Sequence, residues 1–147
     1  CSREARRLAI VTVILSCAHI ACDNGVAPTP VGFVGEWTGT TLHGTPISFS
    51  VSAPDTVTSI TLVYNFSADC SGTLTYANLA VPIHTLDPPG PPPYDQPGFG
   101  YGFNDGARAT FIAGQFSPDR RSASGQFNLV RYGVCGTVMS WWNATRR

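Results

Sequence analysis

Residues 47–52 read ISFSVS, and large apolar side chains alternate there with serine at every position. This alternation is typical of a β-strand that has one buried face and one exposed face. It recurs at 36–42, 60–66 and 99–103, whereas apolar residues at helical spacing never continue beyond one turn. We therefore expect an all-β domain.

The strands follow one another too closely for crossover helices. About eight or nine short strands of this kind predict a single antiparallel β-sandwich or small β-barrel, and the pattern leaves the choice between them open. Segments 114–116 and 125–127 both read GQF and flank a Ser-Pro-Asp turn, which predicts a hairpin. Residues 87–98 are rich in proline, which cannot join a ladder, so we expect a surface loop there.

The beginning of the chain carries a targeting pattern. A basic segment at 3–7 precedes an apolar run at 8–15. This run is too short to span a bilayer, which takes about 20 residues, but it matches the core of a signal peptide. We therefore predict a lipoprotein signal-peptide helix at 1–21, a lipid-anchored tether at 22–32 and the β domain at 33–147. The alternative is that the apolar run is a buried helix of the domain.

Two cysteines are candidates for the lipid anchor. Cys17 has the better local sequence, with an aliphatic residue three positions before it and serine directly before it. Lipidation of Cys22 instead leaves Cys70 and Cys135 as a clean pair in the mature chain. We favour Cys22, with Cys17 as the alternative. Lipidation with two or more acyl chains would hold the protein stably on a membrane of the bacterial cell envelope, on its periplasmic face or outer surface.

The remaining cysteines, Cys70 and Cys135, lie in strand-like segments of a domain that we expect to be exported. A disulfide between them would close a loop of about 65 residues and stabilise the fold by about 4 kcal/mol. A metal-binding pair is the alternative, but two cysteines without a neighbouring histidine make a poor zinc site. We predict the disulfide, no metal and no cofactor.

Charge argues against one class of partner. Beyond residue 21 the chain has six arginines against eight acidic residues, and it contains no lysine. Binding of nucleic acid needs a concentrated basic face. We therefore expect no nucleic-acid partner.

Catalytic motifs are also missing. His43 and His84 are the only side chains beyond residue 21 that ordinarily titrate near neutral pH. Neither belongs to a Gly-x-Ser-x-Gly or His-x-x-His motif or lies near a spaced carboxylate pair. We assign no catalytic residue, and a hydrolase remains the least favoured alternative.

Aromatic residues are the best candidates for ligand contacts. Residues 99–103 read FGYGF, which in an extended chain places three rings on one face and leaves the glycine face bare. Such a row could stack on a sugar or an apolar ligand, but one wall of the core is the favoured interpretation. Adjacent Trp141 and Trp142 must point to opposite faces of their strand. The candidate contacts are Tyr94, Phe99, Tyr101, Phe103 and Trp141.

Several segments together resemble a family of small lipoproteins from environmental bacteria. They are WTGTT at 37–41, GTPISFSV at 44–51, CSG at 70–72, Gly125-x-Phe127, CG at 135–136 and WNATR at 142–146. The resemblance spans nearly the whole β domain. It implies a secreted β domain with paired cysteines, and no catalytic activity comes with it.

A second resemblance is limited to three positions. Gly35-x-Trp37 near the first strand and Arg146 after the last are similar to the lipocalin-like pattern, in which a Gly-x-Trp packs beneath a late arginine at the closed end of a barrel. This resemblance implies an apolar cavity for a small hydrophobic ligand.

From the sequence we expect a non-catalytic binding or structural β module that is tethered to a membrane surface. A lipocalin-like carrier is the main alternative. The expected partners are the membrane, through the lipid anchor, and a glycan, a protein or a small apolar ligand.

Overall fold

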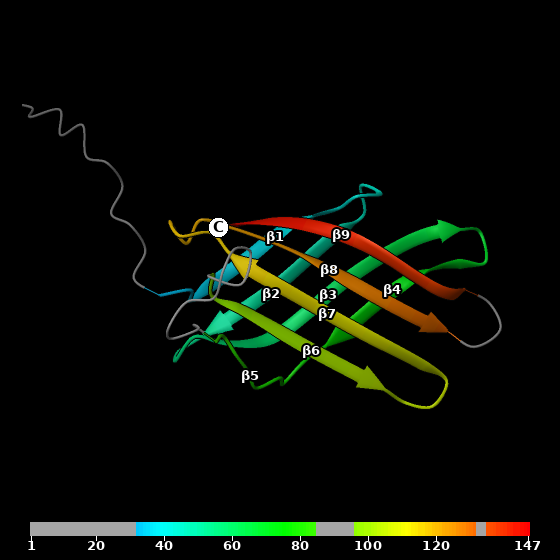
Figure 1. The fold of residues 1–147 in the computed structure, drawn as a ribbon, viewed down its shortest axis with the longest axis horizontal. Helices are drawn as coiled ribbons and strands as arrows, with labels where there is room; N and C mark the ends of the chain where they lie inside the picture. The colour runs from blue at the N-terminus through cyan, green and yellow to red at the C-terminus, as the bar shows by residue number, and fades with distance from the viewer. Residues whose placement is uncertain (1–31, 85–95, 132–134) are drawn as a thin grey trace, which may run out of the picture.

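The computed structural model describes residues 32–84, 96–131 and 135–147, and these residues form an all-β domain (Figure 1). No helix in these ranges is long and apolar enough to cross a membrane. The predictions that lie outside the described residues are the signal peptide at 1–21, the tether at 22–31, Cys17, Cys22, the part of the proline-rich loop at 87–95, and Tyr94.

The described part of the chain contains nine strands. They are β1 (Gly35–Thr41), β2 (Pro46–Ser52), β3 (Thr56–Ser67), β4 (Cys70–Tyr76), β5 (Val81–Pro82), β6 (Gly98–Asn104), β7 (Arg108–Phe116), β8 (Ser122–Arg131) and β9 (Gly136–Arg146). The hairpin expected around the Ser-Pro-Asp turn is confirmed as β7 and β8.

All strands belong to one antiparallel sheet. Its order is β4-β3-β2-β1-β9-β8-β7-β6, and the short β5 pairs with the start of β3. Two meanders, β1 to β4 and β6 to β9, are therefore joined by the pairing of β1 with β9. The sheet curls into a half-barrel rather than splitting into two packed layers (Figure 1), so the structure resolves the sandwich-or-barrel question in favour of the barrel type.

The two ends of the sheet, β4 and β6, share no hydrogen-bonded pair. At one end of the half-barrel, His84 just after β5 bonds to Gly98 of β6, with N···O distances of 2.8 and 3.0 Å. At the other end, a disulfide joins Cys70 at the start of β4 to Cys135 just before β9, with 5.0 Å between the Cα atoms. The predicted disulfide is thus confirmed.

Aromatic rings fill the interior of the curled sheet. The rings of Trp37 and Phe49 are stacked with centroids 5.6 Å apart, and Phe116 meets Trp37 edge-on at 4.9 Å. Phe49 also contacts Phe99 and Trp142, which belong to the other meander. The two meanders therefore share one core and bury it together.

Three residues meet at the end of the half-barrel where β1 begins. Arg146 lies directly opposite Trp37 in the β1–β9 pair, so both side chains belong to the inner face. The Arg146 guanidinium donates to the Gly32 carbonyl at 3.3 Å, and its Nε would lie 2.9 Å from a Cβ on Gly35. The residues that carry the lipocalin-like resemblance are thus neighbours in space.

Candidate functional site

The aromatic row of β6 belongs mainly to the core. Phe99 is buried, and Tyr101 and Phe103 are half-buried. Their rings contact Tyr76 of β4 at centroid distances of 5.1 and 5.3 Å. This arrangement agrees with the interpretation of the row as one wall of the core.

The glycine face of β6 is exposed at Gly100 and Gly102, as expected from the sequence, and a ring of β7 borders it. Phe111 of β7 lies opposite Gly102, and its ring would be 3.6 Å from a Cβ on Gly100 and 3.9 Å from one on Gly102. A ring from the neighbouring strand thus lies beside the open face of the glycines. The pattern FGYGF alone could not show this, because the pairing partner comes from another segment.

The tryptophan pair in β9 confirms the expected alternation. Trp142 is 1% exposed, and its ring lies where side chains on Gly114 and Gly125 would otherwise project. Trp141 is 55% exposed and lies on the outer face of the sheet. Of the candidate contacts that the structure describes, Trp141 is the one that is well placed to meet a ligand.

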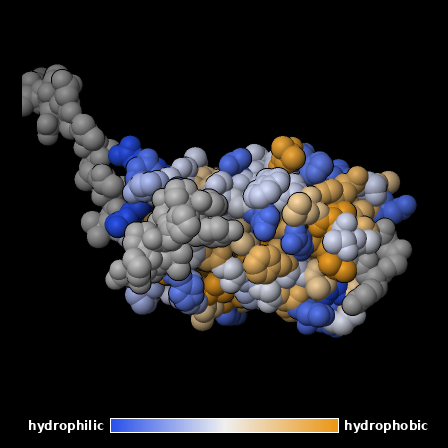
Figure 2. Space-filling model, in the orientation of Figure 1, coloured by the Kyte–Doolittle hydropathy of each residue, from blue (hydrophilic) through white to orange (hydrophobic). Residues whose placement is uncertain are grey.

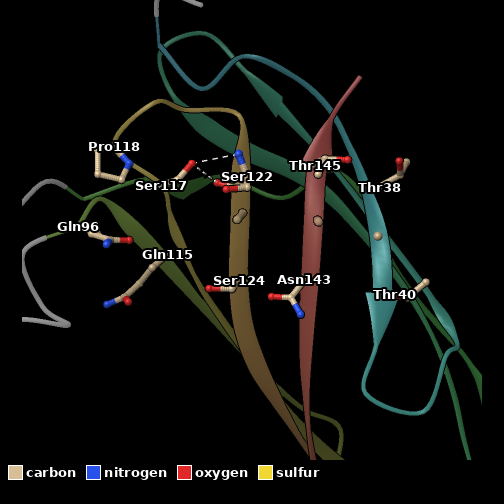
Figure 3. A pocket seen from close by; sticks show the side chains of 13 residues that line it. Thr38, Thr40, Gln96, Gln115, Ser117, Pro118, Ser122, Ser124, Asn143 and Thr145 are labelled. Atoms are coloured by element: carbon tan, nitrogen blue, oxygen red, sulfur yellow. Dashed lines mark hydrogen bonds between the residues drawn. The ribbon is translucent and has the colours of Figure 1, made fainter.

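Beside Trp141 the outer face is hollowed. Two open cavities, of about 800 and about 470 Å³, share Gln96, Gln115, Ser124 and Asn143, and we call the depression that they form together the outer groove. Figure 3 shows the residues that line the smaller cavity. The larger cavity also touches His84, Gly98, Gly100, Ala113, Gln126 and Trp141, and the smaller one Thr38, Thr40, Ser117, Pro118, Ser122 and Thr145.

The register of the strands brings these side chains together on the outer face of the sheet. Ser124 of β8 lies opposite both Gln115 of β7 and Asn143 of β9, and Gln126 lies opposite Trp141. Directly opposite residues project to the same face of an antiparallel sheet. Because the inner positions of these strands are taken by the core, amides and hydroxyls from different strands form a row across the outer face.

The groove is polar but uncharged. None of its described lining residues is Asp, Glu, Lys or Arg, and His84 at its edge is the one histidine among them. Amide side chains both donate and accept hydrogen bonds, and hydroxyls do the same. The groove can therefore satisfy a neutral ligand that carries many hydroxyl groups.

An apolar margin borders the groove. Met139 and Phe111, which are 56% and 43% exposed, lie on either side of Asn128 across the outer face. Leu42, 75% exposed, accompanies Trp141, whose carbonyl accepts its N–H at 2.8 Å. Figure 2 shows hydrophobic residues on this side of the molecule, to the right of the grey atoms.

The two histidines are not joined in a catalytic arrangement by the described residues. His43 is exposed in the turn after β1 and contacts the ring of Phe66 at 4.9 Å. His84 is exposed at the groove edge, where no carboxylate lines the described part of the wall. The geometry that a hydrolase would need is therefore not formed within the described ranges.

The amides of the groove were not singled out from the sequence. Gln96, Gln115, Gln126 and Asn143 are distant in the chain and come together only through the register of β6 to β9. One signal was present, because the repeated Gly-Gln-Phe motif alternates an amide with a core ring in both strands of the β7–β8 hairpin. The motif predicts outward-facing amides, but not that they share a groove.

No protein-family model, curated protein or solved structure matches this chain.

Proposed function

We propose that this chain is a lipid-tethered, non-catalytic binding module of the bacterial cell envelope, and that its ligand is an uncharged glycan held in the outer groove. The observation that carries the proposal is the exposed ring of Trp141 beside a groove whose described lining is amide and hydroxyl.

Sugar rings match both parts of this site. A pyranose has an apolar face of C–H groups that can lie on an indole, and an exposed indole offers a large contact area at little cost in side-chain entropy. Its hydroxyls both donate and accept, as do the side chains of Gln126 and Asn143. Because the described lining has no charged residue, an anionic or cationic ligand would be desolvated there without a partner, which disfavours it.

The filled interior of the half-barrel favours glycan binding over a lipocalin-like carrier function. The two cavities that form the groove lie on the outer face, whereas the inner face is occupied by stacked rings such as Trp37, Phe49 and Phe116. A carrier of apolar ligands needs open space on the inside.

The support for a tether and a lipid anchor comes from the sequence. The segment up to residue 31 has the pattern of a lipoprotein signal and a short linker, and dual acylation suffices for stable attachment to a membrane. A module held in this way would bind glycans at the surface to which it is attached.

Fluorescence of Trp141 tests the proposal directly. The chain has three tryptophans, of which Trp37 and Trp142 are 0% and 1% exposed, so a change at an exposed indole reports on Trp141. We expect soluble neutral glucans, xylans or mannans to shift the emission to shorter wavelength and to retard the protein in affinity gels. Polygalacturonate, an anionic polymer, should do neither.

A matched pair of variants locates the binding. Trp141→Ala should abolish both effects, and Met139→Ala, an equally exposed residue two positions earlier on the same face, should keep them. If no neutral polymer binds, or if Trp141→Ala binds like the wild type, the proposal is wrong.

A further inference from the structure

The outer groove is elongated across the strands. Its described lining comes from five neighbouring strands, β6, β7, β8, β9 and β1, so it spans four strand spacings of about 4.8 Å each. Along the strands it is bounded on one side by the exposed side chains of Phe111 and Met139 and on the other by the β7–β8 turn at Pro118. A chain-like ligand in this groove would therefore lie across the strands.

One row of polar side chains follows this direction. Asn143 of β9 lies opposite Thr40 of β1 and also opposite Ser124 of β8. Ser124 in turn lies opposite Gln115 of β7. We call these four residues the central row, and Figure 3 shows them following one another across the strands. The row thus presents one hydrogen-bonding side chain on each of four adjacent strands.

The central row is accessible and has an aromatic border. Thr40, Ser124 and Asn143 are exposed. Ser124 is short and lies between the longer side chains of Gln115 and Asn143, which leaves a hollow in the middle of the row. Trp141 is two positions before Asn143 on the same face of β9, so its exposed indole borders the row. A ligand in the row can therefore contact an aromatic ring and several polar groups together.

Linear β-1,4-linked glycans match this arrangement. Their pyranose units form an extended, ribbon-like chain that advances by about one strand spacing per sugar. The hydroxyls along both edges of the ribbon donate and accept hydrogen bonds, as do the side chains of the central row. Each sugar can therefore meet one side chain of the row. An α-1,4-linked chain winds into a helix and would turn away from the row.

We infer that the outer groove recognises a linear β-1,4-linked polysaccharide, which crosses β7, β8, β9 and β1 with about four consecutive sugars, one for each strand of the central row. The inference rests on the proposed glycan-binding function and adds the linkage, the direction and the length of the bound segment. The sugar beside Asn143 stacks on Trp141, and its neighbours exchange hydrogen bonds with Ser124 and Thr40.

Oligosaccharides of defined length provide the probes. Cello-, manno- and xylo-oligosaccharides of two to six units are β-1,4-linked, whereas malto-oligosaccharides contain the sugar of the cello series with α-1,4 linkages. Titrations followed by the emission of Trp141 give the affinities. In at least one β-1,4 series we expect the affinity to increase about tenfold or more from two to four units and then to level off, because each added sugar gains hydrogen bonds until the row ends. Maltohexaose should bind no more tightly than maltose.

Two isosteric substitutions test the direction of the bound chain. Thr40→Val removes the hydroxyl at the β1 end of the central row and should weaken tetrasaccharide binding about fivefold. Thr137→Val is the matched control, because Thr137 is also exposed but lies four positions along β9 from Trp141, outside the lining of both cavities. Thr137→Val should leave the affinity unchanged.

The other outcomes separate this inference from the proposed function. Equal affinities for disaccharides and tetrasaccharides, or equal binding of maltohexaose and the β-1,4-linked hexasaccharides, would overturn the inference and leave glycan binding in place. Weaker tetrasaccharide binding in Thr137→Val but not in Thr40→Val would do the same. If no neutral polymer or oligosaccharide changes the emission of Trp141, both proposals are wrong. If Thr40→Val does not fold, the lengths and linkages still decide the question on the wild-type protein.

Discussion

Gly125 of β8 shows how little space a single inner position can have. A Cβ there would lie 1.9 Å from the Ala113 carbonyl oxygen and 2.6 Å from the Trp142 ring. The Ala113 oxygen belongs to the backbone of β7 and cannot turn aside. The absence of a side chain at Gly125 is therefore what allows β7, β8 and the buried indole to pack together.

The first prediction follows from this contact. Gly125→Ala should lower the free energy of unfolding by about 3 kcal/mol or more, because it overpacks a position bounded by backbone. Gly100→Ala is the control, since its Cβ would meet only the Phe111 ring at an ordinary 3.6 Å. Urea unfolding followed by tryptophan fluorescence measures both. A loss at Gly125 no larger than at Gly100 would contradict the close packing described here.

The orientation of the two tryptophans could be predicted at the residue scale, whereas the surroundings of the β6 glycines could not. Alternation requires only the sequence of one strand, so Trp141 and Trp142 could be assigned to opposite faces without a structure. The ring beside Gly100 belongs to the neighbouring strand, and its position depends on register. Register is a relation between segments, and no single segment contains it.

At the scale of elements, the β7–β8 turn is held by a small polar network. The Ser117 hydroxyl donates to the Asp119 carboxylate at 2.5 Å, and the Arg121 N–H donates to the same oxygen at 3.1 Å. These bonds lower the pKa of Asp119 below its ordinary value of 3.8, the Ser117 hydroxyl being the largest cause. The ionised carboxylate therefore stabilises the turn.

The second prediction concerns the stability of the fold at acid pH. Because the pKa of Asp119 is lower in the folded state, its stabilising contribution is fully present above the unfolded pKa and is lost as the pH falls through the folded pKa. Between about pH 5 and about pH 2 the thermal midpoint of the wild type should fall more than that of Asp119→Asn. Parallel curves for the two proteins would contradict the network. Asp69→Asn, an exposed site in the β3–β4 turn, controls for the loss of one carboxylate.

Most elements could be predicted from the sequence, but the groove could not. Clear alternation in 47–52 and 60–66 and the turn at 117–119 gave the strands and the hairpin, because these signals are local. β5 is only Val81–Pro82, shorter than the apolar run around it indicates, because it pairs only with the first two residues of β3. The curl of the sheet and the amide row depend on long-range pairing, for which the sequence has no local signal.

At the scale of the molecule, the edge strands β4 and β6 share no hydrogen-bonded pair, and the two ends of the half-barrel are each held by a separate link. At one end His84 and Gly98 of β6 exchange two hydrogen bonds, and at the other end the disulfide joins the start of β4 to the segment just before β9. The disulfide links the first meander to the second across 65 positions of sequence, so it restricts the unfolded chain strongly.

The third prediction concerns the free energy of unfolding that is lost when the disulfide is removed. Cys70→Ala combined with Cys135→Ala should lower the free energy of unfolding by about 4 kcal/mol, as expected for a loop of this length. Reduction of the wild-type protein should lower the free energy of unfolding by the same amount. A reductant added to the double variant should lower it no further. If the oxidised and reduced forms unfold at the same urea concentration, the disulfide contributes nothing to stability.

The hydrogen bond between the Arg146 guanidinium and the Gly32 carbonyl has an architectural consequence. It places the polypeptide entering β1 beside the polypeptide leaving β9, so the domain begins and ends at nearly the same point in space. A domain with adjacent ends can be inserted into a surface loop of a host protein without forcing that loop apart. This half-barrel is therefore suited to recombination as a cassette, and transplanting residues 32–147 into a host loop should carry the outer groove with it as a unit.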